Sequence, residues 1–157
     1  MTRKVKIYGF EMARISEVYL STLSRLMKPY GMERYFKLFI LLCENSGKIT
    51  QKELGATLKR DKVSTMRSVD YLSENGFVIR KQDPNDKRCQ ILEVTDKALQ
   101  LLPIVKEAIQ QTNELLLADF TPGEKMYFEQ SMDKLFKTIG TLPEPEFIVK
   151  AFKRKIT

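Results

Sequence analysis

The chain has 157 residues, of which 43% are hydrophobic and 30% charged, so it fits one globular domain with its own core rather than a disordered protein. It contains no histidine and only two cysteines, which removes the most common general base and metal ligand, and no metal or other cofactor is expected. The net charge of +7 comes entirely from residues 1–97, because residues 98–157 hold eight basic and eight acidic side chains. This asymmetry favours a polyanion-facing front part and a separate assembly part, although a merely basic, soluble surface is an open alternative.

Two helices are predicted before residue 45. Residues 5–27 repeat apolar side chains at spacings of mostly three to five, which indicates an amphipathic helix, and Pro29 and Gly31 end it. Residues 32–44 are apolar nearly all round in their second half, so this segment is predicted to be a buried helix. Cys43 lies in that run and is interpreted as a core residue.

A helix-turn-helix is predicted between residues 50 and 76. Thr50 and Glu53 form a capping box that starts a short helix, and Asp61 is an N-cap for a second helix that ends at Gly76. Short helices joined by a polar turn of three or four residues are typical of this motif.

A hairpin should follow the helix-turn-helix. Residues 77–81 and 89–94 are predicted to be its strands, and because an isolated hairpin is barely stable in water, we expect it to pack on the helices as a wing. A long helix should start at Thr95 or Asp96 and be kinked or split at Pro103. Thr121, followed by Pro-Gly-Glu, should start a helix that reaches about residue 138. The remaining tail has room for a short helix after Pro145, and the expected fold is mainly α with a small β-hairpin wing.

The wing tip combines acidic and basic residues with different predicted roles. Asp83 and Asp86 can bond to the backbone of a tight turn and Pro84 fixes its own φ, so these three residues are predicted to shape the tip. Lys87 and Arg88 could pair with phosphates or enter a narrow minor groove. Asp86 could also hold Arg88 by a charge-assisted contact. The alternative is an ordinary solvated turn.

The second helix of the motif is predicted to be the recognition helix, which enters the major groove of DNA. Its inward residues should be Thr65, Ser68, Val69 and Leu72, and its outward residues Asp61, Lys62, Ser64, Met66, Arg67 and also Tyr71. Arg67 is the first candidate for a contact to a base edge, and Lys62 and Ser64 are suited to contact phosphates or bases. Lys52 and Lys48 could contact phosphate. Lys59 and Arg60 lie in the turn, where exposure to solvent explains them as well as a phosphate contact does. A solvated charged face on an ordinary helix is the alternative.

The stretch DPNDKRCQILEVTDKA resembles the wing of the MarR family of bacterial transcription regulators. Asp83, Pro84, Asp86, Arg88 and Thr95 fit the family's pattern, and the order of elements agrees over about residues 5–140. Three residues depart from it: Val94 replaces the usual leucine, Ala98 the usual glycine, and Pro103 is unusual in its helix.

The resemblance implies a homodimeric regulator, commonly a repressor, that binds double-stranded DNA at a palindromic site. It divides the single domain 1–157 into a DNA-binding part, residues 32–95, and a helical dimerisation part, residues 1–31 and 96–157. It also implies release from DNA by a small, often aromatic, effector, and in some members oxidant sensing by cysteine. Cys89 is the better sensor candidate here, although a plain surface thiol is preferred. An effector pocket could include Phe10, Met12, Tyr35, Phe36 and Phe39, but the same residues suit a core.

Competing functions find less support in the sequence. A winged helix that binds protein instead of DNA is the main alternative, because the wing has as many acids as bases. An enzyme is disfavoured by the lack of a Gly-rich phosphate loop, a metal cluster or a recognisable nucleophile–base pair. A binder of single-stranded nucleic acid would need exposed aromatics in a basic groove. No apolar run reaches the roughly 18 residues of a membrane span, and no signal peptide is recognised, so a cytoplasmic protein without a membrane partner is expected.

Overall fold

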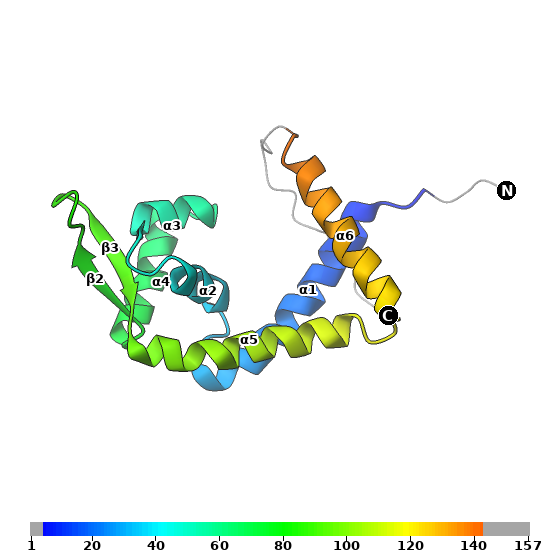
Figure 1. Ribbon diagram of the computed structural model, residues 1–157, viewed down its shortest axis with the longest axis horizontal. Helices are drawn as coiled ribbons and strands as arrows, with labels where there is room; N and C mark the ends of the chain where they lie inside the picture. The colour runs from blue at the N-terminus through cyan, green and yellow to red at the C-terminus, as the bar shows by residue number, and fades with distance from the viewer. Residues whose placement is uncertain (1–4, 143–157) are drawn as a thin grey trace. The chain divides into compact units, whose positions relative to one another are not determined.

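The structure is a computed structural model that describes residues 5–142. Its contacts group the chain into two compact units (Figure 1). One unit spans Ser21–Thr112, and the other holds the residues up to Leu20 and from Asn113 onward. The short helix expected after Pro145 lies outside the described residues.

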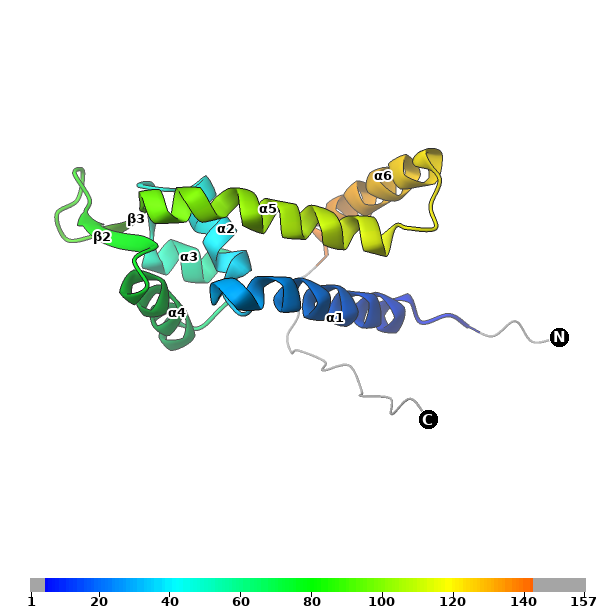
Figure 2. The ribbon, with the colours of Figure 1, turned by 90° about the horizontal axis from the view of Figure 1, so that it is seen from below.

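The elements follow one another in an order that confirms the expected fold class, mainly helical with a small antiparallel sheet. They are α1 Tyr8–Met27, the 3-10 helix η1 Lys28–Tyr30, α2 Phe36–Glu44, β1 Ile49–Thr50, α3 Gln51–Thr57, α4 Lys62–Glu74, β2 Val78–Gln82, β3 Gln90–Val94, α5 Asp96–Leu116 and α6 Pro122–Ile139. In both views α3 and α4 lie next to the β2–β3 hairpin (Figure 2).

The predicted caps of α3 and α4 and the predicted end of α4 are confirmed. Thr50 accepts a hydrogen bond from the Glu53 amide at 3.2 Å, while Glu53 accepts one from the Thr50 amide at 2.8 Å. Asp61 caps α4 by accepting from the Ser64 amide at 2.8 Å, and this bond lowers the pKa of the Asp61 carboxyl. Gly76 follows α4 with a φ of 73°, as a left-handed residue after a helix requires.

The wing is a three-stranded sheet rather than the hairpin alone, with the order β1-β3-β2. β3 pairs antiparallel with β2, Val78 facing Val94, and with β1, Ile49 facing Leu92. The sequence analysis missed β1 because two residues show no period-2 pattern of their own. Val78 and Leu92 are each 1% exposed, so one face of the sheet joins the core.

The predicted start of the second helix was wrong by four residues. Helix α2 begins at Phe36 instead of residue 32, because the residues before it form a turn. Gly31 has a φ of 67°, and the amides of Tyr35 and Phe36 both bond to the Met32 carbonyl at 3.0 Å. Met32 is fully buried in this turn. The helix therefore loses its expected first turn but keeps the buried face.

The core of the unit Ser21–Thr112 collects side chains from nearly every element in it. Its fully buried large residues include Phe39, Met27, Leu38, Leu42, Leu54, Leu72, Val69 and Val105. The Phe39 ring meets the Phe77 ring edge to face, with centroids 6.0 Å apart. This core fixes α2, α3 and α4 beside the sheet, and so positions the surface described below.

Helix α5 runs through Pro103 without a break, so of the two predicted effects of Pro103, a kink or a split, the split does not occur. Pro103 and Leu99 are both exposed, and the Leu99 carbonyl that loses its helical partner can bond to water. No helix within residues 5–142 is long and apolar enough to cross a membrane.

The other compact unit is built from helices with few buried side chains. The Tyr19 hydroxyl of α1 donates to the Asn113 amide oxygen of α5 at 2.7 Å, and the rings of Phe120 and Phe128 meet edge to face. Helix α6 has the predicted capping box at Thr121 and Glu124 but contains no buried residue. Large apolar side chains remain exposed on α1 and α6: Tyr8, Phe10, Met12, Ile15, Met126, Tyr127, Leu135, Phe136 and Ile139.

Candidate nucleic-acid interface

Helix α4 has a buried face and an exposed face, as predicted for a recognition helix. Thr65, Ser68, Val69 and Leu72 are buried. The two polar residues among them are satisfied locally, because Thr65 donates to the Asp61 carbonyl and Ser68 to the Ser64 carbonyl, each at 2.9 Å. The exposed face carries Lys62, Ser64, Met66 and Arg67 together with Val63, which the sequence analysis did not name. This face can meet another molecule without disturbing the core.

Tyr71 does not belong to the exposed face, so its predicted outward position is corrected. Its ring stacks on Tyr35 with centroids 4.1 Å apart, and its hydroxyl donates to the Gly31 carbonyl at 2.8 Å. Burial, with the nearby Glu33 charge, raises the pKa of the Tyr71 hydroxyl. Tyr71 therefore ties α4 to the turn before α2.

The turn between α3 and α4 is fixed by close backbone packing. A Cβ on Gly55 would lie 3.0 Å from the Thr65 hydroxyl, so a side chain there would push the two helices apart. Lys59 has a φ of 48°, and the Arg60 amide donates to the Gly55 carbonyl at 2.9 Å. The turn thus holds Lys59 and Arg60 at a defined place beside the start of α4.

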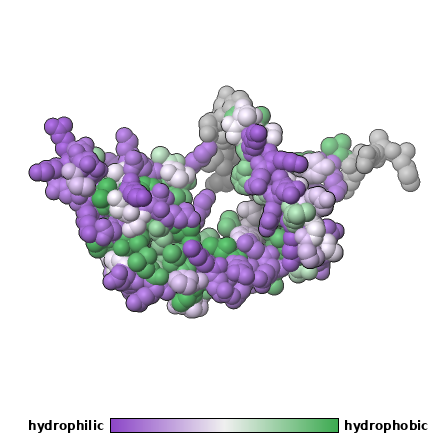
Figure 3. All heavy atoms as spheres, in the orientation of Figure 1, coloured by the Kyte–Doolittle hydropathy of each residue, from purple (hydrophilic) through white to green (hydrophobic). Residues whose placement is uncertain are grey.

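The acidic residues shape the wing tip through backbone bonds. Asp83 accepts from the Asn85 amide at 2.8 Å and Asp86 accepts from the Arg88 amide at 2.9 Å. The predicted contact between Asp86 and Arg88 is therefore made to the backbone of Arg88. Lys87 and Arg88 are both exposed at this tip, and Figure 3 shows hydrophilic side chains gathered over the wing.

An ion pair that the sequence analysis missed ties the wing to α4. The Arg80 guanidinium of β2 binds the Asp70 carboxylate of α4 at 2.5 Å and the Gln51 amide oxygen of α3 at 3.4 Å. Both charged side chains are partly buried, at 29% and 41% exposure. A second ion pair, Lys81 with Glu93 at 2.7 Å, lies within the hairpin itself. The recognition helix and the wing are thus joined by side chains as well as by sequence.

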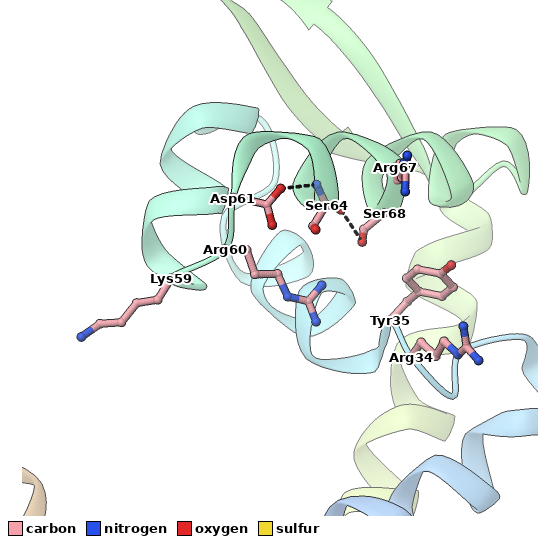
Figure 4. Close-up of a pocket in the computed structure, with 8 residues that line it drawn as sticks. All are labelled: Arg34, Tyr35, Lys59, Arg60, Asp61, Ser64, Arg67 and Ser68. Atoms are coloured by element: carbon pink, nitrogen blue, oxygen red, sulfur yellow. Dashed lines mark hydrogen bonds between the residues drawn. The ribbon is translucent and has the colours of Figure 1, made fainter. Parts of the chain in front are cut away.

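A hollow of about 510 Å³ lies between the exposed face of α4 and the segment before α2. It is lined by Arg34, Tyr35, Lys59, Arg60, Asp61, Ser64, Arg67 and Ser68 (Figure 4). The structure thus brings Ser64 and Arg67, which the sequence singled out, together with Arg60 and with Arg34, which it did not. Lys62 and Met66 are exposed on α4 outside the lining, Lys52 is exposed on α3 and Lys48 just before β1.

The residues considered for an effector pocket are divided between the two compact units. Phe39 is fully buried and belongs to the core, as the preferred interpretation had it. Tyr35 and Phe36 are half-buried in the same unit, whereas Phe10 and Met12 are exposed in the other unit. Within residues 5–142 no cluster of three or more metal-ligating side chains occurs.

Both thiols are expected to react slowly with iodoacetamide. Burial, with the Glu44 charge, raises the pKa of Cys43 to about 11, so at pH 8 only about 0.1% is thiolate and alkylation should be roughly 100-fold slower than for a peptide thiol. Cys89 is exposed, but its hydrogen bond to Asp86 and that carboxylate's charge raise its pKa too. Alkylation of Cys89, followed by mass spectrometry, should be faster in Asp86→Asn than in the unaltered protein. Peptide-like reactivity of Cys89 in the unaltered protein would make it a credible oxidant sensor.

Comparison with known proteins gives the same result as the geometry. Residues 37–90, which hold α2, the helix-turn-helix and the wing, match the MarR family model. A MarR protein structure from Peptoclostridium difficile DA00132 is 29% identical, with a TM-score of 0.74 over 88% of this chain and 90% of that one.

Residues 37–90 are those of a MarR-family winged helix-turn-helix.

Two further relatives cover most of its length. A transcriptional regulator of the family from Listeria monocytogenes, solved in complex with a 26mer DNA, is 27% identical with a TM-score of 0.75, over 86% of this chain and 90% of that one. The transcriptional repressor MprA of Escherichia coli K12 is 23% identical over 134 residues, 84% of this chain and 76% of MprA. The protein is therefore a DNA-binding transcriptional regulator of the MarR type and not an enzyme.

Proposed function

We propose that this MarR-family protein binds a palindromic operator as a homodimer and represses transcription until a small, often aromatic, effector releases it. The observation that carries the proposal is the exposed face of α4, with Arg67, Ser64 and Lys62, beside a wing whose tip exposes Lys87 and Arg88. In a winged helix-turn-helix such a helix enters the major groove and the wing reaches the backbone or minor groove. The Listeria relative, solved in complex with a 26mer DNA, supports DNA binding by this chain.

Homodimerisation is supported by the apolar side chains that the single chain leaves exposed. Phe136 is 65% exposed and Ile139 58%, on α6, which buries no residue, and Tyr8 at the start of α1 is 66% exposed. Exposed apolar groups of this number are typical of an interface that another chain covers. We therefore propose that α1, α6 and the end of α5 form the dimerisation part, and residues 32–95 the DNA-binding part. Repression rests on the relative MprA and on the family, and effector release on the family alone.

The proposal is tested by binding of the purified protein to duplex DNA from upstream of its own gene. An unrelated duplex serves as competitor, and the titration is repeated at several salt concentrations because phosphate contacts make affinity fall with salt. Sedimentation of the complex gives the number of chains per duplex. We expect two chains on one selective site.

Two arginine variants should separate base reading from backbone contact. Arg67→Ala should weaken binding by about 1–3 kcal/mol and reduce discrimination between the duplexes, since arginine gives the most common contact to guanine. Arg88→Ala should lower the affinity for both duplexes equally and lower the salt dependence of binding by about one phosphate contact. Lys106→Ala, an exposed lysine of α5, is the matched control and should change neither.

Other outcomes would contradict the proposal in distinct ways. Selective binding that both arginine variants leave unchanged would place the DNA on another face. A lack of binding to any duplex at low salt would favour the alternative in which the winged helix binds a protein partner.

A further inference from the structure

Two large apolar side chains lie on the exposed face of α4, among the polar residues proposed to contact DNA. Val63 is 52% exposed and Met66 is 41% exposed. They are the second and fifth residues of the helix, and because they are three positions apart, they lie on the same side of it. Neither belongs to the lining of the hollow in Figure 4, to which Ser64 and Arg67 contribute.

Burial against the core does not explain either of these side chains. The buried residues of α4 already cover the core, and Val63 and Met66 are not among them. A β-branched residue such as valine also loses rotamer freedom in a helix, and an exposed position offers little burial to offset that loss. A single exposed apolar residue is common on protein surfaces. Here two of them share one side of the helix that is proposed to enter the major groove.

The two side chains differ in stiffness, and each is suited to a contact with a base edge. Val63 lies in the first turn of α4, and the N-terminal residues of a recognition helix are those that contact base edges. Its χ1 angle has one strongly preferred value in a helix, so docking costs it little freedom. Met66 is unbranched and flexible, so it can adapt its shape to a neighbouring base. The pair therefore offers one fixed and one adaptable apolar group.

We propose that Val63 and Met66 read the 5-methyl groups of two thymines in each half-site of the operator. In the major groove thymine alone presents a methyl group, and an apolar side chain recognises it by direct contact. The inference rests on the proposed function, because it requires that α4 enters the major groove. It assigns the thymines to this apolar pair and a guanine to Arg67.

The geometry of the helix limits where these thymines lie. Side chains three or four positions apart in a helix have Cβ atoms about 5–6 Å apart, and successive base pairs are about 3.4 Å apart. Val63 and Met66 therefore span roughly one or two base-pair steps. Arg67 follows Val63 by four positions, so it is about as far from Val63 as Met66 is. Each half-site should hold the two thymines and the guanine within about three base pairs of one another.

The test replaces single thymines by deoxyuridine, which pairs with adenine in the same way and lacks only the 5-methyl group. The unaltered protein first selects its preferred duplexes from a random pool, and each thymine of the selected site is then replaced in turn. Fluorescence anisotropy measures the affinities at one salt concentration, for the unaltered protein and for three variants. Val63→Ser and Met66→Gln remove the apolar groups and keep a similar helix propensity. Leu99→Gln, which alters a leucine of α5 that is 51% exposed, is the matched control.

We expect a position-specific effect of the methyl groups. At two neighbouring thymines of each half-site, uracil should lower the affinity of the unaltered protein about fourfold, as expected for one methyl group no longer removed from water. Val63→Ser should abolish this loss at one of the two positions and Met66→Gln at the other, whereas Leu99→Gln should keep both losses. A variant that weakened binding in general would lower the affinity for all the duplexes by the same factor, so it would leave the effect of uracil unchanged.

Two results would overturn the inference and leave the proposed function intact. One is a selected operator at which no uracil substitution lowers the affinity, and the other is a uracil effect that both Val63→Ser and Met66→Gln retain in full. All three altered side chains are exposed, and melting curves check that the variants fold. A protein that selects no duplex from the pool would overturn the proposed function, and this inference with it.

Discussion

Gly31→Ala is expected to lower the free energy of unfolding by about 2–3 kcal/mol. Gly31 has a φ of 67°, where a side chain costs about 1 kcal/mol. Its new Cβ would also lie 2.6 Å from the Tyr71 hydroxyl, which donates to the Gly31 carbonyl. The Tyr71 ring is stacked on Tyr35 and cannot swing away freely, so this hydrogen bond should be lost at a further cost of about 1–2 kcal/mol. Urea unfolding measures the sum.

Two control variants separate the strain from the clash. Gly76→Ala places a Cβ at a φ of 73° with nothing nearer than the Lys97 side chain at 3.9 Å, so it should cost the strain of about 1 kcal/mol alone. Adding Tyr71→Phe to Gly31→Ala removes the clashing oxygen. The free energy of unfolding should therefore fall less in the double variant than in the two single variants added together. Equal losses for Gly31→Ala and Gly76→Ala would show that the contact with Tyr71 has no energetic weight.

Asp70→Asn is expected to weaken DNA binding roughly 10- to 100-fold while leaving the fold intact, since a hydrogen bond between charged groups contributes about 1.5–3 kcal/mol. Asp70 itself need not touch DNA. Its carboxylate holds Arg80 of β2, and through it the wing, at a fixed place relative to α4. Without this ion pair the wing and the recognition helix would no longer be spaced to reach the duplex together. Titration well below the melting temperature separates this effect from unfolding.

Coupling to the wing tip distinguishes positioning from a general loss of stability. If Asp70 acts by placing the wing, Arg88→Ala should cost less affinity in the Asp70→Asn background than alone. Glu93→Gln is the matched control, because it breaks the Lys81–Glu93 ion pair inside the hairpin and not between the hairpin and α4. The positioning role would be refuted if the effects of Asp70→Asn and Arg88→Ala on DNA affinity were additive. It would also be refuted if Glu93→Gln lowered DNA affinity as much as Asp70→Asn does.

The features that the sequence predicted correctly are local ones. Thr50, Asp61 and Thr121 cap their helices by bonding to amides three residues further on. The turn of the wing is likewise closed by Asp83 and Asp86 on amides two residues away. The buried face of α4 follows from the 3.6-residue period alone. These signals need no knowledge of the rest of the fold, because donor and acceptor are neighbours in the chain.

The tertiary structure alone decided what depends on packing between distant segments. Asp70 meets Arg80 across ten residues, Tyr71 meets Gly31 across forty, and Ile49 pairs with Leu92 in the sheet. Tyr71 was expected outside because its helical position allows that, and the stacking partner that draws it inward comes from the segment before α2. Arg34 joins the hollow for the same reason. The local pattern of this chain determines its helices, caps and wing turn, whereas the side chains that meet at its surface are set by how the core brings those elements together.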